Sequence, residues 1–480
     1  MSPYSGAVRD AAEKSRSVSE GEMSGLLKGA LAVGGGVAAA EVLRRGFWPR
    51  PRYEPWERPP FSEFPNRVLI LGGGFAGFTA AKTLCKLTRH RDDVGVMLIS
   101  RENYFTFWPM LPGVVSSDID TKNVAQPLRR ALIRLGASFR RAEVESIDPD
   151  KRCVKAGGRE FSYHHLIVAL GGEPAYFGIP GVEEHAISMT GVGTAEAIRN
   201  RVIERYEETT MARGSVPDSK LTFVVIGGGA TGVEVASELH ELVHEILAPD
   251  YPNIDPHRVR IVLVDRNEQV LKELDPALRR TARKKLADLG IEVINEVKAR
   301  EITADKVILD DGREIETENA VWTAGFRASE RLDDLDLPHD ARKGLKVDAY
   351  MRVEGYDDVW GIGDCAANVD EDGKPVPPNA QAAVQEGRAV ARNVLAAIDG
   401  REEDLEPFDY RPLGQLVEMG SEFAVNEVLG IKFSGLMASL FWRMTYLYKL
   451  ESPQSRARIA ADWCLDLFYR PAVTEIRGRG

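Results

Sequence analysis

Residues 67–84 read RVLILGGGFAGFTAAKTL, and residues 221–239 repeat the pattern as LTFVVIGGGATGVEVASEL. In each copy a short apolar run meets three glycines spaced GxGxxG and then continues with the apolar periodicity of a helix. The first glycines of the two copies, Gly72 and Gly227, are 155 positions apart. Two copies of this pattern in one chain predict two nucleotide-binding units, each built from a strand, a tight turn and a helix.

The glycine spacing has a mechanical reason in each unit. Gly72 permits the tight turn, Gly74 lets the backbone approach a pyrophosphate, and Gly77 lets the helix pack on the strand. The free N–H groups and the positive dipole end of the helix then face the phosphates. The same three positions of the second unit are occupied by Gly227, Gly229 and Gly232. The sequence therefore predicts an α/β fold with two Rossmann-like dinucleotide-binding domains.

The residues that end the next strand differ between the two units. In the second unit the strand RVRIVLVD ends in Asp265, whose carboxylate can hold both ribose hydroxyls of NAD and would repel a 2′-phosphate. NADH is therefore favoured over NADPH, although Arg266 beside it leaves the strictness of this preference open. In the first unit the strand VGVMLIS ends in Ser100, followed by Arg101, so the residue that holds the first ribose stays open.

Composition excludes several classes of function. At 480 residues the chain is long enough for two or three globular units. Its 44 % hydrophobic and 28 % charged residues are typical of folded rather than disordered chains. A formal net charge of −11 repels phosphate backbones, which argues against a nucleic-acid partner.

The four cysteines are separated by 68, 212 and 99 positions: Cys85, Cys153, Cys365 and Cys464. This spacing gives no local metal-ligand set and no neighbouring dithiol, so we expect neither a metal site nor disulfide-reductase chemistry. It fits a reducing cytoplasm. No stretch reaches the roughly 18 to 20 apolar residues of a membrane-spanning helix. Residues 1–65 read as a polar tail and a Pro/Arg/Trp-rich linker.

A third stretch, PPNAQAAVQEGRAVARN at 377–393, places Gln381 and Gln385 one helical turn apart among small residues. A helix with so few large side chains can approach a flat ring, and the two amides can hydrogen-bond its oxygen or nitrogen atoms. The alternative is an exposed Ala-rich helix with polar spacers.

Taken together, these stretches resemble the flavoproteins with two dinucleotide-binding domains, in which FAD occupies the first Rossmann unit and a nicotinamide cofactor the second. HHLIVALGG and VWGIGDCAA resemble two further FAD-contacting segments of that superfamily, with Leu170 where the first usually has Thr. Within the superfamily the similarity is closest to the type II NADH:quinone oxidoreductases, the single-subunit, non-pumping NADH dehydrogenases of respiratory chains. It rests on RENYFTFWPMLP, GIPGVEEHA, AVWTAGF and AQAAVQEG.

The resemblance implies a division of the chain into four parts. After a tail and linker over 1–65, the FAD-binding domain would comprise 66–184 and 326–400, and the NADH-binding domain 185–325. The last part, 401–480, would be a membrane-associating region.

The resemblance also implies three groups of site residues. The residues expected to hold FAD are Gly72, Gly74, Phe75, Ala76, Gly77, Ser100, Arg101, Pro109, Val144, Ala169, Gly171, Asp364 and Gln381. The residues expected to hold NADH are Gly227, Gly229, Thr231, Gly232, Glu234, Asp265, Ala324 and Gly325. The family's AQxAxQ pattern implies quinone contacts for Gln381, Ala383 and Gln385.

Glu234, Gln381 and Gln385 are the residues that we expect to be catalytic. Glu234 would hydrogen-bond the nicotinamide or help to relay protons; the alternative is a carboxylate that the helix dipole favours. Asp364 would bind the ribityl or pyrophosphate part of FAD; the alternative is a helix N-cap. Cys365 beside it is more simply a small core residue than a site of sulfide chemistry.

The last 50 residues fit a lipid-soluble acceptor on physical grounds. In 431–450 apolar residues recur at spacings of three and four: Phe433, Leu436, Met437, Leu440, Phe441, Met444 and Leu447. Lys432, Arg443 and Lys449 fall among the polar positions. A second run places Ile459, Trp463, Leu467 and Phe468 on one side, with Arg456, Arg458 and Arg470 at its ends. Such helices can lie in the membrane interface, with basic residues near anionic headgroups; completion of the core or a dimer interface is the alternative.

Together with these features, the resemblance implies hydride transfer from NADH to FAD and then transfer of two electrons to a membrane quinone, without proton pumping. The expected partners are the quinone, the membrane surface and a second copy in a homodimer, at the cytoplasmic face of the cell membrane. Alternatives are a sulfide:quinone oxidoreductase, which needs at least two cysteines at the flavin, and a ferredoxin- or rubredoxin-type reductase, which has no amphipathic tail. A redox-responsive flavin-binding interaction protein is a further alternative, which predicts slow NADH oxidation.

Overall fold

The computed structural model describes residues 59–212, 216–340 and 343–475. These residues belong to one compact unit that begins at Pro59. The predicted tail and linker lie outside the described residues up to position 58.

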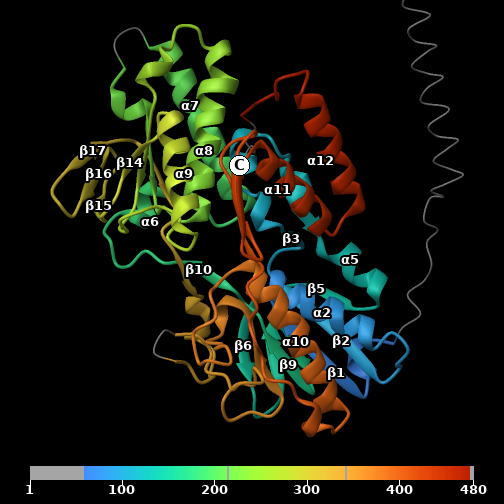
Figure 1. Cartoon of the computed structure of the whole chain (residues 1–480). Coiled ribbons are helices and arrows are strands. Elements are labelled where there is room, and N and C mark those ends of the chain that lie inside the picture. Colours follow the sequence, from blue (N-terminus) through green and yellow to red (C-terminus); the bar gives the residue numbers. More distant parts are fainter. Residues whose placement is uncertain (1–58, 213–215, 341–342, 476–480) are drawn as a thin grey trace, which may run out of the picture. The chain divides into compact units, whose positions relative to one another are not determined.

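The first large sheet is parallel and has five strands in the order β20-β9-β1-β2-β5 (Figure 1). Its strands are β1 (Asn66–Leu71), β2 (Val94–Ser100), β5 (Ser138–Arg141), β9 (His165–Val168) and β20 (Val359–Gly361). Apolar residues run almost continuously through β1 and β2 because both faces of a parallel sheet are covered. On one face lie α2 (Phe75–Leu87) and α10 (Ala380–Ile398), which pack against each other. This sheet is completed by a strand, β20, that follows the whole second unit in the sequence.

The second large sheet repeats this parallel arrangement in the order β11-β18-β12-β13-β14. Its strands are β11 (Ala186–Ser188), β12 (Thr222–Ile226), β13 (Arg260–Val264), β14 (Glu292–Ile294) and β18 (Asn319–Trp322). Its helices are α7 (Val192–Met211), α8 (Ala230–His240) and α9 (Pro276–Asp288), and Glu241–Leu247 continues α8 as a π-helix. The prediction of an α/β fold with two Rossmann-like parallel sheets is confirmed.

A short antiparallel pair joins the chain that enters the second unit to the chain that leaves it. Here β10 (Gly172–Pro174) pairs with β19 (Phe326–Ala328). Smaller elements surround the two sheets. They are α3 (Gly113–Ser116), α4 (Thr121–Val124), α5 (Leu128–Leu135), α6 (Val182–His185), β3 (Tyr104–Thr106), β4 (Ala125–Pro127), β6 (Val144–Asp148), β7 (Cys153–Ala156), β8 (Arg159–Ser162), β15 (Ala299–Ile302), β16 (Lys306–Leu309) and β17 (Glu314–Glu316).

The C-terminal part forms an antiparallel sheet and two helices. The strands are β21 (Gly414–Glu418), β22 (Ala424–Val428) and β23 (Ile431–Gly435), and the helices are α11 (Leu436–Lys449) and α12 (Pro453–Asp466). Ile459 of α12 is buried, and because the helix ends at Asp466, Leu467 and Phe468 lie beyond it rather than on one face with Ile459 as predicted. Across the described residues, no helix combines the length and the apolar character that crossing a membrane requires.

Candidate functional site

The first GxGxxG turn leaves an open space in front of α2. Gly72 has φ +107°, and a Cβ added to it would lie 2.0 Å from the carbonyl oxygen of Ala169. A Cβ on Gly77 would lie 2.1 Å from the oxygen of Gly72, so the close packing of helix on strand requires glycine there. A Cβ on Gly74, by contrast, would meet no protein atom within 4 Å. Gly74 is the N-cap of α2 and has no side chain to cap it, so the first N–H groups of the helix face this space.

The second turn has the same geometry. Gly227 has φ +118°, and a Cβ on Gly232 would lie 1.7 Å from its oxygen. A Cβ on Gly229, the N-cap of α8, would again meet nothing within 4 Å. In each unit, therefore, no side chain covers the backbone at Gly74 or Gly229, where an anion could approach the helix N-terminus.

A fixed carboxylate stands beside the second turn. Asp265 is buried and accepts hydrogen bonds from the N–H of Gly228 and from Asn267, through its N–H at 2.6 Å and its side-chain amide at 2.7 Å. These bonds hold the carboxylate at the end of β13, where the adenosine ribose of a dinucleotide is expected.

Ser100 occupies the corresponding place in the first unit. The N–H of Gly72 donates to the oxygen of Ile99 at 2.8 Å, as the N–H of Gly227 donates to that of Val264 at 2.8 Å. Ile99 is followed by Ser100, whereas Val264 is followed by Asp265. A hydroxyl thus replaces the carboxylate, while the side chain of Arg101 is exposed.

The remaining residues predicted to hold FAD come from separate segments of the chain. Phe75 and Ala76 lie in the first turn of α2, as Thr231 does in that of α8. Val144 is the first residue of β6. It lies two residues after Ala142, whose N–H donates to the oxygen of Ser100, the last residue of β2, at 3.0 Å. Pro109 lies in the 3-10 turn Trp108–Met110, whose Trp108 ring meets Phe326 edge-on at 5.8 Å between centroids. Gly171 follows Ala169 with φ +73°.

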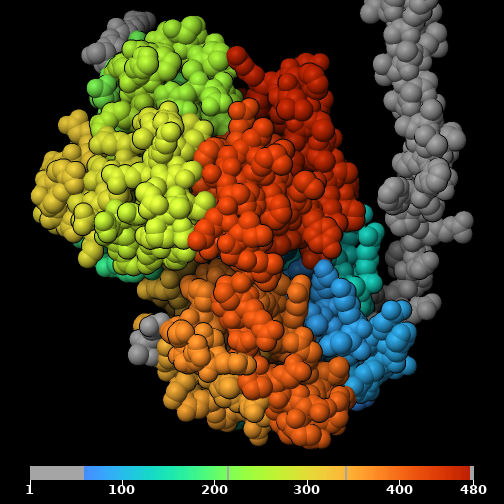
Figure 2. Space-filling view, in the orientation of Figure 1, coloured from blue at the N-terminus to red at the C-terminus, as the bar shows by residue number. Residues whose placement is uncertain are grey.

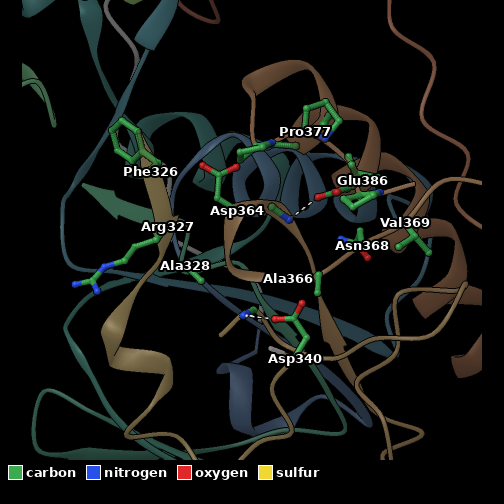
Figure 3. Close-up of a pocket in the computed structure, with 18 residues that line it drawn as sticks. Phe326, Arg327, Ala328, Asp340, Asp364, Ala366, Asn368, Val369, Pro377 and Glu386 are labelled. Atoms are coloured by element: carbon green, nitrogen blue, oxygen red, sulfur yellow. Dashed lines mark hydrogen bonds between the residues drawn. The ribbon is translucent and has the colours of Figure 1, made fainter. Parts of the chain in front are cut away.

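A pocket of about 510 Å³ connects the late FAD-like motif to α10 (Figure 3). Asp364, Ala382, Ala383 and Glu386 are among the residues that line it. Burial raises the pKa of Asp364 above its usual range, and no other cause contributes. The carboxylate of Glu386 accepts the N–H of Gly363, and burial raises its pKa to about 7. Asp364 is thus a half-buried acceptor that faces a cavity, whereas Glu386, which the sequence analysis did not single out, holds the motif's turn.

The side chains of the two glutamines bind the main chain of the C-terminal part. The side-chain amide of Gln381 donates to the oxygen of Gly414 at 3.1 Å and accepts the N–H of Leu413 at 2.6 Å. Gln385 donates to the oxygen of Arg411 at 2.8 Å and accepts its N–H at 3.1 Å. Both amides therefore bind the main chain of residues 411–414, which we call the strap. Each amide keeps one N–H for another partner.

Glu234 lies under the C-terminal sheet. Its carboxylate is buried and accepts the N–H of Glu418 at 3.3 Å, and burial raises its pKa to about 8. The nearby WTAGF segment is also fixed, because the N–H of Ala175 donates to the oxygen of Gly325 at 3.0 Å. A Cβ on Gly227 would lie 2.8 Å from the Cα of Ala324, so this segment packs directly against the second turn.

A group of buried and half-buried charged residues adjoins Glu234 and was missed from the sequence. Its members come from four separate parts of the chain: Asp118, Glu238, Glu418 and Arg443. The i,i+4 spacing of Glu234 and Glu238 puts both on one face of α8 and is the one sequence signal for this group. Arg443 does not lie on an exposed polar face as predicted; its guanidinium stacks over the Trp463 ring, 4.8 Å from the centroid, and faces two of these acids.

Comparison with known proteins identifies the family of this chain. Residues 66–387 match the family model of the pyridine nucleotide-disulphide oxidoreductases. The chain is 30 % identical over 430 residues to the type II NADH:quinone oxidoreductase Ndh of Mycobacterium tuberculosis, covering 86 % of this chain and 90 % of the relative. It is also 30 % identical over 406 residues to the demethylphylloquinone reductase NdbB of Synechocystis sp., covering 83 % and 95 %. This chain belongs to the type II NADH:quinone oxidoreductase family.

A solved structure shares this fold. The structure of NDH2 from Plasmodium falciparum in complex with NADH matches with a TM-score of 0.78 at 19 % identity, covering 85 % of this chain and 99 % of that one. At this identity the likeness shows a shared fold.

The thiol chemistry that a sulfide-oxidising member of this fold needs has no support at Cys365. Its Sγ donates to the oxygens of Ile362 at 3.2 Å and Val168 at 3.6 Å. Burial raises the pKa of the thiol to about 12, so the reactive thiolate is scarce at neutral pH.

Proposed function

We propose that this type II NADH:quinone oxidoreductase oxidises NADH on the second Rossmann unit, passes the electrons to FAD on the first, and reduces a membrane quinone without pumping protons. The observation that carries the proposal is the pair of bare helix N-termini at Gly74 and Gly229, one of them beside the fixed carboxylate of Asp265. Bound FAD supplies the chemistry, which accepts two electrons as a hydride and releases them to the quinone.

Several groups of the first unit would hold FAD. The N–H groups at the start of α2 would hold the pyrophosphate, and Ser100 would lie at the adenosine ribose. Asp364, half-buried in the lining of the pocket, would accept hydrogen bonds from ribityl hydroxyls. Ala382 and Ala383 leave the start of α10 thin enough for a flat ring to approach.

The second unit fits NADH rather than NADPH. Asp265 would bind the ribose hydroxyls, and its charge would repel a 2′-phosphate. Ala324 and Gly325, packed against the glycine turn, would let the nicotinamide come close to the flavin. Glu234 would meet the nicotinamide end with a protonated carboxyl at neutral pH, because its pKa is raised to about 8.

Gln381 and Gln385 would serve the quinone chiefly by holding the strap in place. The strap leads directly into β21, whose Glu418 covers Glu234. We propose that the quinone enters between α10 and this sheet, where each amide still has one N–H to offer.

The exposed side chains of α11 support docking on a membrane. The C-terminal part to which this helix belongs lies at the surface of the molecule, in orange and red in Figure 2. The helix buries Ala438, Ser439 and Trp442 and leaves most of its other large apolar residues exposed. The exposed apolar residues of the C-terminal part, which we call the apolar patch, are Leu429, Ile431, Leu436, Met437, Leu440, Phe441, Met444, Tyr448, Leu465, Leu467, Phe468 and Tyr469. An apolar surface of this extent on a protein that reduces a lipid-soluble quinone is best covered by lipid.

The same proposal assigns the parts of the chain. FAD would be bound by 66–184 and 326–400, NADH by 185–325, and the membrane by 401–480, at the cytoplasmic face. A homodimer that buries part of the apolar patch is the competing use of this surface.

The proposed reaction is tested by mixing the purified flavoprotein with NADH and a short-chain quinone and following the absorbance of both. We expect NADH to be oxidised in step with quinone reduction, and sulfide in place of NADH to give no quinone reduction. Oxidation that requires a protein acceptor would contradict the proposal.

Membrane docking is tested separately by co-sedimentation with anionic vesicles. The double variant Met437→Glu/Met444→Glu should lose vesicle binding while it keeps ferricyanide reduction. The control is Met211→Glu on α7, because Met211 is 71 % exposed and the two α11 methionines are each 72 % exposed. If the α11 variant binds vesicles as tightly as the control but changes from dimer to monomer in light scattering, the patch is a subunit interface instead.

A further inference from the structure

Three parts of the first unit meet at one buried carboxylate, that of Glu386 in the second turn of α10. It accepts the N–H of Gly363, the first residue of the 3-10 turn Gly363–Cys365 that follows β20 (Figure 3). The next residue of α10, Gly387, packs on α2, because a Cβ there would lie 2.5 Å from the oxygen of Ala76. A Cβ on Gly363 would in turn lie 3.1 Å from the Cβ of Ala76. The start of α10, this turn and the first turn of α2 are therefore in contact around Glu386.

The charge of Glu386 has no cationic partner. The residue is 3 % exposed, and within 59–212, 216–340 and 343–475 no Lys, Arg or His forms an ion pair with it. The titratable groups that face it are Asp364 and Cys365, which can add only negative charge. Burying an unpaired charge is costly, so a leucine or a glutamine would serve better if this position only filled space. The carboxylate therefore indicates a role beyond packing.

The hydrogen bond from Gly363 fixes the residue next to it. Gly363 has φ +73°, and its turn has no side-chain cap of its own. On the side of the sheet the main chain holds the turn, because the N–H of Ile362 donates to the oxygen of Val168 at 3.0 Å. On the side of α10 Glu386 supplies a bond, and a charged acceptor makes that bond about twice as strong as a neutral one. The place of Asp364 relative to α10 therefore depends on Glu386.

The same carboxylate belongs to the lining of the FAD pocket. Asp364 and Glu386 line it together with Ala382 and Ala383 at the start of α10. In the proposed function the ribityl chain of FAD would lie at Asp364 and its ring at the two alanines. Reduction brings electrons into this environment, and a neighbouring carboxylate opposes added negative charge.

We propose that Glu386 is a positioning residue for FAD. Its carboxylate fixes the turn of Asp364 against α10, which strengthens FAD binding, and its negative charge lowers the reduction potential of the bound flavin. The proposal rests on the proposed function only in that FAD occupies the first unit; it does not depend on the acceptor that reoxidises the flavin. Because one effect comes from the hydrogen bond and the other from the charge, two substitutions separate them.

Glu386→Gln keeps the shape of the side chain and an oxygen that can accept the N–H of Gly363, but it removes the charge. Its Kd for FAD should stay within about fivefold of the parent, because a neutral hydrogen bond replaces a charge-assisted one. The midpoint potential of the flavin should move to a more positive value. This potential is measured anaerobically against reference dyes at about pH 8, above the pKa of about 7 of Glu386, so that the parent carboxylate is charged.

Glu386→Leu fills the same buried space but removes both the charge and the hydrogen bond. Its Kd for FAD should rise about 10-fold or more, since a hydrogen bond to a charged group contributes that much. Titration of the apoprotein with FAD, followed by the quenching of flavin fluorescence, measures the Kd, and circular dichroism shows whether the fold is retained. If Glu386→Leu does not fold, the potential of Glu386→Gln still decides.

The control is Glu371→Gln, which removes one negative charge from the exposed loop between this turn and α10. Its Kd and its potential should be those of the parent, because water and salt screen an exposed charge. An unchanged potential in Glu386→Gln, or an equal shift in the control, would overturn the proposal, as would a Glu386→Leu protein that binds FAD as tightly as the parent. A parent protein that binds no FAD would contradict the proposed function as well. A parent that reduces quinone through bound FAD, with neither property responding to Glu386, would overturn this proposal alone.

Discussion

The bare backbone at Gly229 gives a sharp test of how NADH binds. In Gly229→Ala the added methyl group meets no protein atom within 4 Å, and the φ of −73° suits alanine, so the free protein should fold unchanged. A backbone N–H reaches a phosphate oxygen at about 2.9 Å, whereas a methyl carbon needs about 3.5 to 4.0 Å, so the methyl group would push the pyrophosphate away. Forcing one extra carbon into a close contact costs about 1 to 3 kcal/mol, which corresponds to roughly a 5- to 150-fold rise in the KM for NADH.

Steady-state NADH oxidation with ferricyanide measures this KM, and flavin absorbance and thermal unfolding show whether FAD and the fold are retained. Gly232→Ala is the matched control, because its Cβ would lie 1.7 Å from the oxygen of Gly227 and should destabilise the unit itself. A Gly229→Ala enzyme with the KM of the parent would refute the placement of NADH on this turn. Loss of FAD in the same variant would equally contradict the division of the two cofactors.

Three further changes probe the site. Asp265→Asn should narrow the preference for NADH over NADPH at least about tenfold in kcat/KM, since a hydrogen bond to a charged group contributes roughly 1.5 to 3 kcal/mol; an unchanged ratio would count against Asp265 as the ribose ligand. Gln385→Ala removes two hydrogen bonds to the strap, so it should lower the free energy of unfolding by about 1 to 2 kcal/mol and raise the KM for quinone. Arg388→Ala, on the exposed side of α10, should change neither quantity. Burial raises the pKa of Glu234 from 4.5 to about 8, so its contribution to stability is fully present below about pH 4.5 and is lost as the pH rises through 8. The melting temperature of Glu234→Gln should therefore fall less between pH 4.5 and pH 8 than that of the parent. Parallel plots of melting temperature against pH for the two proteins would contradict the burial of Glu234 as a protonated acid.

The parts of this site that depend on local sequence were predictable. Six consecutive residues are enough to predict each glycine turn, because the conformation and close packing at Gly72 or Gly227 depend on neighbours along the chain. The acid at the end of β13 follows from the same local pattern. The prediction that Gln381 and Gln385 share a helix face also stands in the structure, because that face depends only on helical periodicity.

The partners across the fold were not predictable. Nothing near the glutamines in the sequence indicates that their amides bind the strap, whose first residue, Arg411, lies 26 residues after Gln385. Arg443 occupies a polar position of an amphipathic helix, which favours exposure. Its side chain is only 17 % exposed because Asp118 and Glu418, which are distant in sequence, both face its guanidinium. Periodicity predicts the apolar positions of α11, but it does not show which of them are buried: Trp442 is buried, whereas Met437 and Met444 are exposed.

The central claim is that one polypeptide passes electrons from NADH through bound FAD to a quinone. An anaerobic titration of the purified flavoprotein with NADH, followed by addition of a short-chain quinone, tests it most directly. The account predicts that NADH bleaches the flavin absorbance and that one equivalent of quinone restores it, with one NADH consumed for each hydroquinone formed. A flavin that NADH bleaches but quinone does not reoxidise would contradict the account.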